Sequence, residues 1–419
     1  MNGLRSPSVA RFEIAGVVGA ALLLAALLSI RIAAPWSYLH DDNGAWTQAV
    51  ATAHLRAGLQ RTRGQDFFMR RADGGLDPYL HHPPLYPLIE AVAYRVTGTS
   101  GPLTTRAVPA LFHLLGFAGT FVLARRLFPA RPAVRLGALC LYATVPMSTF
   151  FGKLAFNEPV GLALVVWALV LTLRHRAAPR AGALLPAACL WLLALATSWP
   201  CAALLFGFWL LQVLDWRRGR PGAGAAAVVL GATGLAGLAL VLGQLAWAAG
   251  GDLARLSQAG GTWGISGGQA HGLMRSLGRA LDSHRIYFAN APFLLFLGWL
   301  AARARTRLRG RPLAEPDRVL LAGSFGAALW AVAFVHQAGM HGYGQFWFLP
   351  FETLAVAEAA DACWRGLAAR PRWRAALAAL AVAATAWSSA ATLRHRYAEP
   401  WEYAVRTARM YETRYYTRP

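Results

Sequence analysis

Charged residues are scarce in this 419-residue chain: they make up 14% of the sequence, whereas 56% of it is hydrophobic. A soluble domain usually carries about 25% charged residues. The charges stand in short clusters between long apolar runs, a pattern that is typical of membrane proteins and argues against a soluble fold. The net charge of +22 does not indicate nucleic-acid binding, because the basic residues form no single stripe or tail.

Cysteine and lysine are also nearly absent. The four cysteines all lie inside apolar runs, so they are expected to be small core residues, and the sequence indicates neither a disulfide framework nor a zinc motif. Lys153 is the only lysine, and arginine supplies the remaining basic residues.

Long apolar runs take up most of the chain and predict an all-α polytopic membrane fold. A hydrocarbon core needs roughly 20 helical residues, and we expect about eleven spanning helices. They are 13–33, 103–126, 134–151, 158–174, 181–197, 199–214, 222–249, 288–303, 318–336, 345–363 and 374–391. The first run lacks a good cleavage site and is predicted to be a retained signal anchor. The segment 83–97 is apolar but short, and is predicted to lie in the membrane interface.

Arginine clusters predict the orientation of these spans. More than half of the basic residues fall in the N-terminal segment and in short connections that the positive-inside rule assigns to the cytoplasm. These connections are 125–135, 174–180, 217–220, 303–318 and 365–374. The N-terminus is then cytoplasmic, and the outer face holds the first loop 34–101, the loop 250–287 and the tail 392–419.

Two adjacent carboxylates, Asp41 and Asp42, follow the first span. Charges at that depth are costly unless they are solvated or used. The spacing of small and apolar residues over 44–59 predicts an amphipathic helix that lies on the membrane and has these acids at its positive end. One of them can be an N-cap, although a cap needs only one aspartate. The alternative is that the pair takes a proton from a substrate hydroxyl.

Other polar residues of the same face are candidates for substrate binding. Tyr79, His81 and His82 precede a helix, where a histidine pair can bind phosphate, with metal binding as the less favoured alternative. Asn157 and Glu158 open the fourth span. Glu158 is either an N-cap or a group that orients a hydroxyl or joins the two aspartates around a cation.

Cationic and aromatic residues complete this set. Arg106 is placed near the outer end of the second span, where it can meet a lipid phosphate, and Lys153 precedes the fourth span. His341 and Tyr343 lie in a short glycine-containing turn late in the chain. Carboxylates, cations and aromatics at the membrane surface suit a substrate with a lipid tail, a phosphate and a sugar, because the cations can stabilise a phosphate leaving group.

These motifs resemble those of the GT-C superfamily of membrane glycosyltransferases, in the branch of protein O-mannosyltransferases and lipid A aminoarabinose transferases. The likeness is clearest over 13–215, the expected catalytic module with its outer loop 34–101. Residues 216–391 then add further helices within one integral membrane domain, 1–419. The motifs that carry it are Asp41-Asp42, Tyr79 with His82-Pro83-Pro84-Leu85, Arg106, Asn157-Glu158-Pro159 and His341-Gly342-Tyr343.

The resemblance implies an inverting displacement from a polyprenyl-phosphate-linked sugar donor to a hydroxyl of a glycan, lipid or protein acceptor. It implies that the first acid of the pair, Asp41, is the catalytic base and that the second supports it, although the spacing to Gly58 leaves open whether Asp41 or Asp42 has the first role. The position of His82 is lysine in the aminoarabinose transferases. Metal dependence varies in the superfamily, so a divalent cation such as Mg²⁺ or Mn²⁺ is left open. A prokaryotic inner membrane and a periplasmic active face are also implied.

Two other classes of function are alternatives to this one. A transporter or flippase of lipid-linked substrates would favour ionisable residues within the membrane and broken helices in paired halves, whereas most span centres here lack charge. A non-catalytic assembly subunit would not depend on its acidic residues. The clustering of acids in outer loops favours the glycosyltransferase.

Overall fold

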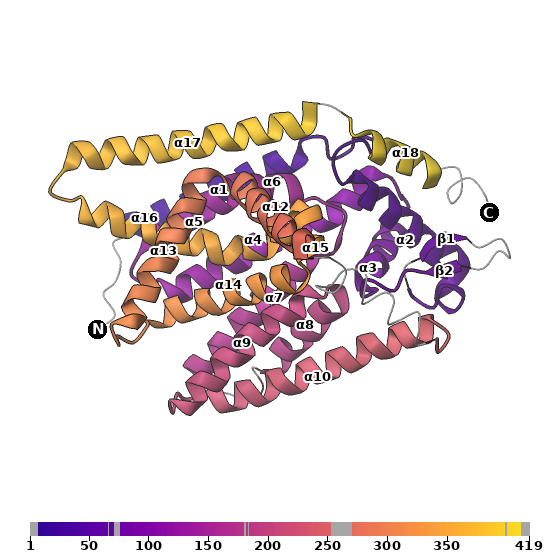
Figure 1. Cartoon of the computed structure of the whole chain (residues 1–419), viewed down its shortest axis with the longest axis horizontal. Helices are drawn as coiled ribbons and strands as arrows, with labels where there is room; N and C mark the ends of the chain where they lie inside the picture. Colours follow the sequence, from indigo (N-terminus) through magenta and orange to yellow (C-terminus); the bar gives the residue numbers. More distant parts are fainter. Residues whose placement is uncertain are drawn as a thin grey trace.

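A computed structural model of the chain describes residues 7–65, 67–70, 76–179, 182, 184–252, 270–398 and 400–411. Its helices form a bundle, with the labelled N-terminus at one end and the C-terminus at the other (Figure 1). The first part of the bundle contains α1 (Pro7–Ser29), α2 (Asp41–Thr62), β1 (Phe67–Arg70), β2 (Leu76–Pro78), α3 (Leu85–Thr97), α4 (Pro102–Leu127), α5 (Pro132–Thr144), α6 (Pro146–Phe151), α7 (Asn157–Ala177) and α8 (Leu184–Thr197). The second part contains α9 (Pro200–Arg217), α10 (Ala223–Ala248), α12 (Ala270–Phe288), α13 (Asn290–Leu308), α14 (Glu315–Ala333), α15 (Val335–Met340), the 3₁₀ helix η3 (Gly342–Phe348), α16 (Leu349–Gly366), α17 (Pro371–Ala398) and α18 (Glu402–Tyr411).

Proline sets where many of these helices begin. Pro102, Pro132 and Pro200 each open a helix, where the missing backbone N–H is not needed and the fixed φ suits the first turn. Pro146 has the same role for α6, and it forces Val145 into an extended conformation. The predicted span 134–151 is therefore broken into α5 and α6.

The all-α fold class is confirmed, since each of the eleven predicted spans coincides with helical structure. Among the described residues, five helices are by themselves long and apolar enough to cross a membrane: α1, α4, α7, α10 and α17. A sixth span results if α12 and α13, which meet at 113°, are counted as one broken span. The chain is thus a multi-pass membrane protein, and the number of eleven crossings stays a prediction.

The arginine-rich connections gather at one end of the bundle. Ion pairs join them across long distances in the sequence, with nitrogen–oxygen separations of 2.6–3.5 Å. The pairs are Arg126–Glu315, Arg131–Asp361, Arg135–Glu13, Arg176–Asp215 and Arg303–Glu358. Figure 1 shows the connections after α9, α13 and α16 at this end, and α2, α3 and the β1–β2 ribbon at the opposite end. All predicted inner loops that the structure describes therefore share one side, and the cytoplasmic identity of that side remains the prediction of the charge rule.

The opposite end holds α2, α3, α18 and an antiparallel ribbon that the sequence did not predict. The helix predicted over 44–59 is present as α2, but its expected placement on the membrane surface is wrong for its first half. All side chains from Gly44 to Ala51 are buried, because α3, α4 and α18 pack around α2. Small residues on several faces of α2 permit this burial, and they can resemble an amphipathic pattern in the sequence. The helix predicted over 83–97 is confirmed as α3, and its position in the interface stays a prediction.

Candidate active site

The two aspartates open α2 and differ in their contacts. His40 has a left-handed backbone conformation (φ 65°), which turns the chain into the helix. Asp41 Oδ2 accepts hydrogen bonds from the backbone N–H groups of Ser37 (2.9 Å) and Tyr38 (2.8 Å), on the side that precedes the helix. Asp41 is therefore not the N-cap of α2, and its carboxylate instead fixes the turn that leads into the helix.

Arg106 holds the same carboxylate in place. Its Nη2 lies 3.0 Å from Asp41 Oδ2, while Nη1 donates to the carbonyls of Ile32 (3.0 Å) and Ala34 (2.5 Å). The guanidinium also covers the ring of Trp36 at 4.2 Å. Burial raises the pKa of Asp41, and the guanidinium opposes that shift. The sequence placed Arg106 where it could meet a lipid phosphate. In the structure its guanidinium is instead buried and paired with Asp41.

Asp42 has a freer carboxylate than Asp41. Its side chain is half-buried, and Oδ1 has no hydrogen-bond partner among the described residues. Burial raises the pKa of Asp42 to about 6, the negative charge of Asp41 raises it further, and the backbone N–H groups of Asp42 and Asn43 oppose the shift. At neutral pH this carboxylate is mostly ionised, yet basic enough to accept a proton. The two neighbouring acids therefore differ: the carboxylate of Asp41 is held by three hydrogen bonds, whereas Asp42 Oδ1 has no partner among the described residues.

The start of α7 and the helix η3 lie close to α2. The fourth-span residues Asn157 and Glu158 are buried, and Asn157 Nδ2 and Glu158 Oε2 lack hydrogen-bond partners among the described residues. The helix α7 begins at Asn157 with Phe156 as its N-cap, so Glu158 is not the cap. Thr47 Oγ1 of α2 donates to the carbonyl of Ala155 (3.1 Å), which ties the start of α7 to the acid pair.

Tyr343 of η3 lies between the start of α7 and the start of α2, within electrostatic range of Glu158 and Asp42. Its hydroxyl lies close to the side chain of Asn43, whose Nδ2 has no hydrogen-bond partner among the described residues. Burial raises the pKa of Tyr343, and the charges of Glu158 and Asp42 raise it further. Its ring lies 5.4 Å from that of Phe156. Tyr343 is therefore a neutral phenol between two carboxylates that lie 116 positions apart in the sequence.

The histidine loop forms a third side. The ring of Tyr79 contacts the rings of His81 (4.7 Å) and His82 (5.5 Å) in tilted arrangements, and the His82 ring meets that of Phe156 edge-on at 5.0 Å. Gln65 Nε2 donates to the carbonyls of Tyr79 (2.7 Å) and His82 (3.0 Å), which fixes the path of the loop. Burial and the neighbouring His81 lower the pKa of His82 to about 3, so its ring is uncharged at neutral pH.

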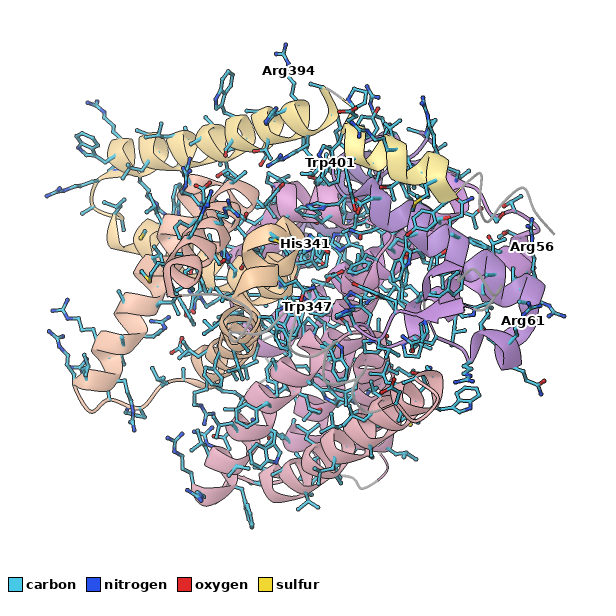
Figure 2. All side chains as sticks on the ribbon, turned by 45° about the vertical axis from the view of Figure 1, so that its right-hand side comes forward. Arg56, Arg61, His341, Trp347, Arg394 and Trp401 are labelled. Atoms are coloured by element: carbon cyan, nitrogen blue, oxygen red, sulfur yellow. The ribbon has the colours of Figure 1, made fainter. Side chains whose placement is uncertain are left out.

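Two distant segments close the site near His40. The ring of His341 lies 5.7 Å from His40 and is stacked on Tyr343 at 5.0 Å. Trp401 lies 5.9 Å from His40, and its backbone N–H donates to the carbonyl of Ser37 (2.6 Å). Figure 2 shows His341 and Trp347 within the bundle, whereas Arg56, Arg61 and Arg394 point outward. The C-terminal segment therefore contacts the turn that orients the acid pair.

Lys153 lies on a different face of Asp41 from this group. Its Nζ donates to the carbonyl of Ile30 and stands 5.1 Å from the centre of the Tyr397 ring. With Asp41 and Arg106 it lines a cavity of about 20 Å³, room for about one water molecule. Burial and the nearby Arg106 lower the pKa of Lys153 to about 7. Arg106 and Lys153 thus lie on the side of Asp41 that lines this small cavity. The other predicted residues lie on the side of Asp42 and Tyr343.

Some residues of the site carry no signal in the sequence. Trp347 is fully buried with an indole N–H that has no partner among the described residues, and it contacts the Gly161 turn of α7 that follows Glu158. Arg396, in the last turn of α17, covers the ring of Tyr287 at 5.4 Å and acts electrostatically on His40. Neither residue belongs to a recognisable motif. Each comes close to the site only because helices distant in the sequence pack together, and the sequence alone does not show this.

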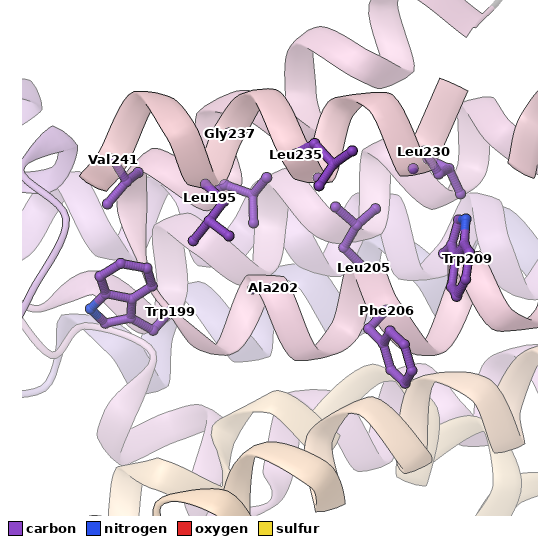
Figure 3. A pocket seen from close by; sticks show the side chains of 13 residues that line it. Leu195, Trp199, Ala202, Leu205, Phe206, Trp209, Leu230, Leu235, Gly237 and Val241 are labelled. Atoms are coloured by element: carbon purple, nitrogen blue, oxygen red, sulfur yellow. The ribbon is translucent and has the colours of Figure 1, made fainter. Parts of the chain in front are cut away.

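An apolar groove of about 370 Å³ begins beside the histidine loop. It runs between α8, α9 and α10, with Trp199 at one end and Trp209 at the other (Figure 3). Trp199 Nε1 donates to the carbonyl of His81 (2.8 Å), and Leu80 packs against Val241 of α10. A linear apolar chain in this groove would therefore end next to His81 and His82.

The residues of the site do not form a ready metal cage. Among the described residues, no three histidine, cysteine, aspartate or glutamate side chains converge on one point, and Asp41 is already paired with Arg106. The available acceptors of Asp42 and Glu158 stand on different helices with Tyr343 in range of both.

Comparisons with known proteins find similarity in structure but not in sequence. No protein-family model and no curated protein sequence matches the chain. The apo oligosaccharyltransferase of Archaeoglobus fulgidus superposes with a TM-score of 0.63 at 14% identity, covering 91% of this chain and 56% of that one. The oligosaccharyltransferase AglB of the same organism, in complex with an inhibitory peptide and a dolichol-phosphate, gives 0.61 at 14%, covering 96% and 56%.

A bacterial structure is also similar. ArnT from Cupriavidus metallidurans bound to undecaprenyl phosphate gives a TM-score of 0.54 at 16% identity, covering 83% of this chain and 60% of that one. The present chain thus spans little more than half of the length of these proteins. Another structure of the A. fulgidus oligosaccharyltransferase holds Zn and sulfate.

Proposed function

We propose that this chain, which has the fold of the GT-C membrane glycosyltransferases, transfers a sugar from a polyprenyl-phosphate-linked donor to a hydroxyl of a cell-envelope acceptor. The similar structures of AglB and ArnT hold dolichol-phosphate and undecaprenyl phosphate. The candidate active site has a basic carboxylate and neutral hydrogen-bond donors, and an apolar groove begins beside its histidine loop; such a reaction needs these groups.

Asp42 is the catalytic base of this proposal. Its carboxylate has an acceptor without a partner and a pKa of about 6, whereas the carboxylate of Asp41 is occupied by Arg106 and two backbone N–H groups. The acceptor hydroxyl gives its proton to Asp42 while its oxygen attacks the anomeric carbon. The bond from that carbon to the phosphate oxygen breaks, and polyprenyl phosphate leaves with the electron pair. A single displacement of this kind inverts the anomeric centre.

The leaving phosphate needs donors and positive charge on the opposite side of the sugar. In this proposal His82 and His341, which lie within electrostatic range of each other, supply the donors, and the lowered pKa of His82 means that it donates a hydrogen bond as a neutral ring. Arg396 supplies a permanent charge near His40. Lys153 is less suited to this role, because its ammonium already binds the Ile30 carbonyl behind the acid pair.

The groove beside Trp199 suits the lipid tail of the donor. It is lined almost wholly by apolar side chains, and the glycines of α10 at positions 231, 234 and 237 leave room between the leucines of that helix. A tail in this groove places the phosphate next to His81, whose carbonyl binds Trp199. Glu158 and Asn157, buried with unpaired polar atoms, are then placed to bind hydroxyls of the transferred sugar.

The observation that carries the proposal is the different state of the two aspartates, and it is tested with the purified protein. We expect Asp42→Asn to lower sugar transfer by about 10²–10⁴-fold, the usual effect of removing a general base, while the protein still inserts and folds. The assay uses a panel of synthetic polyprenyl-phosphate sugars and measures both the glycosylated product and the released polyprenyl phosphate. Movement of an intact donor across proteoliposomes without cleavage would contradict the proposal.

A further inference from the structure

A second groove, of about 410 Å³, lies between α9 and α14 at the arginine-rich end of the bundle. The two helices meet where Gly207 faces Gly326. A Cβ on Gly207 would stand 2.5 Å from the Ala322 carbonyl, and one on Gly326 would stand 2.7 Å from Leu204 Cα. Only glycine permits this approach. The groove starts at Gly207 and follows both helices toward their charged ends.

The walls of this groove are apolar over most of its length. The lining side chains come from α9, α14 and the connection that precedes α14: Leu210, Leu211, Leu214, Pro312, Leu313, Leu321, Ala322 and Phe325. From Gly207 to Arg218 the helix rises about 16 Å at 1.5 Å per residue. Half of a hydrocarbon core of roughly 30 Å is about 15 Å. The groove therefore has the length of one acyl chain in one leaflet.

The mouth of the groove is strongly cationic. Arg218, Arg220, Arg307 and Arg318 all line it. Arg218 and Arg307 are exposed, whereas Arg318 is only 6% exposed. Arg318 Nη1 binds Asp215, but its Nε and Nη2 have no hydrogen-bond partner among the described residues. Buried guanidinium donors without partners are costly, so an anionic ligand at this mouth would satisfy them.

The acids near the groove do not neutralise these arginines. Glu315 acts on Arg318, but it also pairs with Arg126 (3.5 Å). Asp215 is fully buried and is shared by Arg318, Arg176 (2.7 Å) and Arg220 (3.4 Å). One carboxylate thus faces three guanidinium groups, and the exposed Arg218 and Arg307 add to the excess. A phosphate group between these side chains would lower their mutual repulsion.

We propose that this groove binds an anionic phospholipid, with its phosphate among the four arginines at the mouth and one acyl chain along α9 and α14. Free phosphate would not use the apolar walls, and a zwitterionic lipid would bring an ammonium group toward the arginines. Basic pockets between membrane helices are known sites for anionic headgroups. The site lies at the opposite end of the bundle from the aspartates, so it is separate from the proposed catalytic site.

Arg218 and Arg307 are suitable positions for the test, because both are exposed and neither pairs with Asp215 as Arg318 does. We expect Arg218→Gln/Arg307→Gln to weaken binding of phosphatidylglycerol about 25-fold, since each arginine near an anionic group contributes roughly fivefold. The matched control is Arg305→Gln/Arg309→Gln, two exposed arginines of the same region that do not line the groove. Native mass spectrometry of the full chain in detergent, titrated with one lipid at a time, gives the dissociation constants.

The unmodified protein should bind phosphatidylglycerol more tightly than phosphatidylcholine. Phosphatidylglycerol should also raise the melting temperature of the protein. Inorganic phosphate at constant ionic strength should not raise it at concentrations on the order of 10–100 mM, which are usual for weak anion binding. The control variant should match the unmodified protein. Equal loss of binding in both double variants, equal affinity for both lipids, or the same stabilisation by phosphate alone would each overturn the proposal.

Discussion

The ionisation of Asp42 predicts how sugar transfer depends on pH. Burial and the charge of Asp41 place the pKa of Asp42 at about 6, and a base must be ionised to accept a proton. The ionised fraction is then roughly 90% at pH 7 and roughly 10% at pH 5. We therefore expect kcat/KM to fall about tenfold from pH 7 to pH 5, with the half-point near pH 6.

The assay is transfer from a fixed donor in detergent at constant ionic strength, with folding checked at each pH. Asp41→Asn provides the internal test, because removing a neighbouring negative charge lowers the pKa of Asp42 and moves the half-point to lower pH. A profile that is flat from pH 5 to pH 8, or an acidic limb that stays in place after Asp41→Asn, would refute the role of Asp42.

Three further predictions follow from individual contacts. Arg106→Gln should lower the free energy of unfolding in detergent by about 3–5 kcal/mol, since it leaves the buried carboxylate of Asp41 without its cation, and an effect below about 1 kcal/mol would contradict this. Gly234→Leu should raise the KM for long-chain donors about tenfold by filling the groove beside Trp199, whereas Gly243→Leu on the same helix should not; equal effects in the two variants would exclude the groove as the tail site. Tyr343→Phe removes the hydroxyl that lies within electrostatic range of Asp42 and Glu158. We expect it to lower kcat about three- to tenfold without loss of stability, a result that a purely structural tyrosine would not give.

The helices could be predicted from the sequence because their signal is local. Apolar runs and proline positions indicate α4 and α9 without any knowledge of their neighbours, and arginine clusters correctly group the connections at one end. The predicted surface helix over 44–59 failed because burial on all sides depends on α3, α4 and α18. The β1–β2 ribbon was missed because its strands have only four and three residues.

The sequence could predict that several of these polar residues lie near one another, but it could not predict their contacts. Asp41, Asp42, Glu158 and Tyr343 all have chemically informative types and fall on one predicted face. The pairing of Arg106 with Asp41 joins positions 65 apart and has no sequence signature. Only the packing of α4 against the turn before α2 reveals that one aspartate is occupied and the other is available.

The central claim is that Asp42, rather than Asp41, faces the reacting sugar, and a donor-bound structure tests it most directly. Cryo-electron microscopy of the protein with a non-hydrolysable polyprenyl-phosphonate sugar would locate the anomeric carbon. In a reactive complex the base lies about 3 Å from the acceptor oxygen, and that oxygen lies about 3–3.5 Å from the anomeric carbon. The Asp42 carboxylate should therefore lie within roughly 6 Å of the anomeric carbon. An anomeric carbon beside Lys153, or more than about 10 Å from Asp42, would contradict the account.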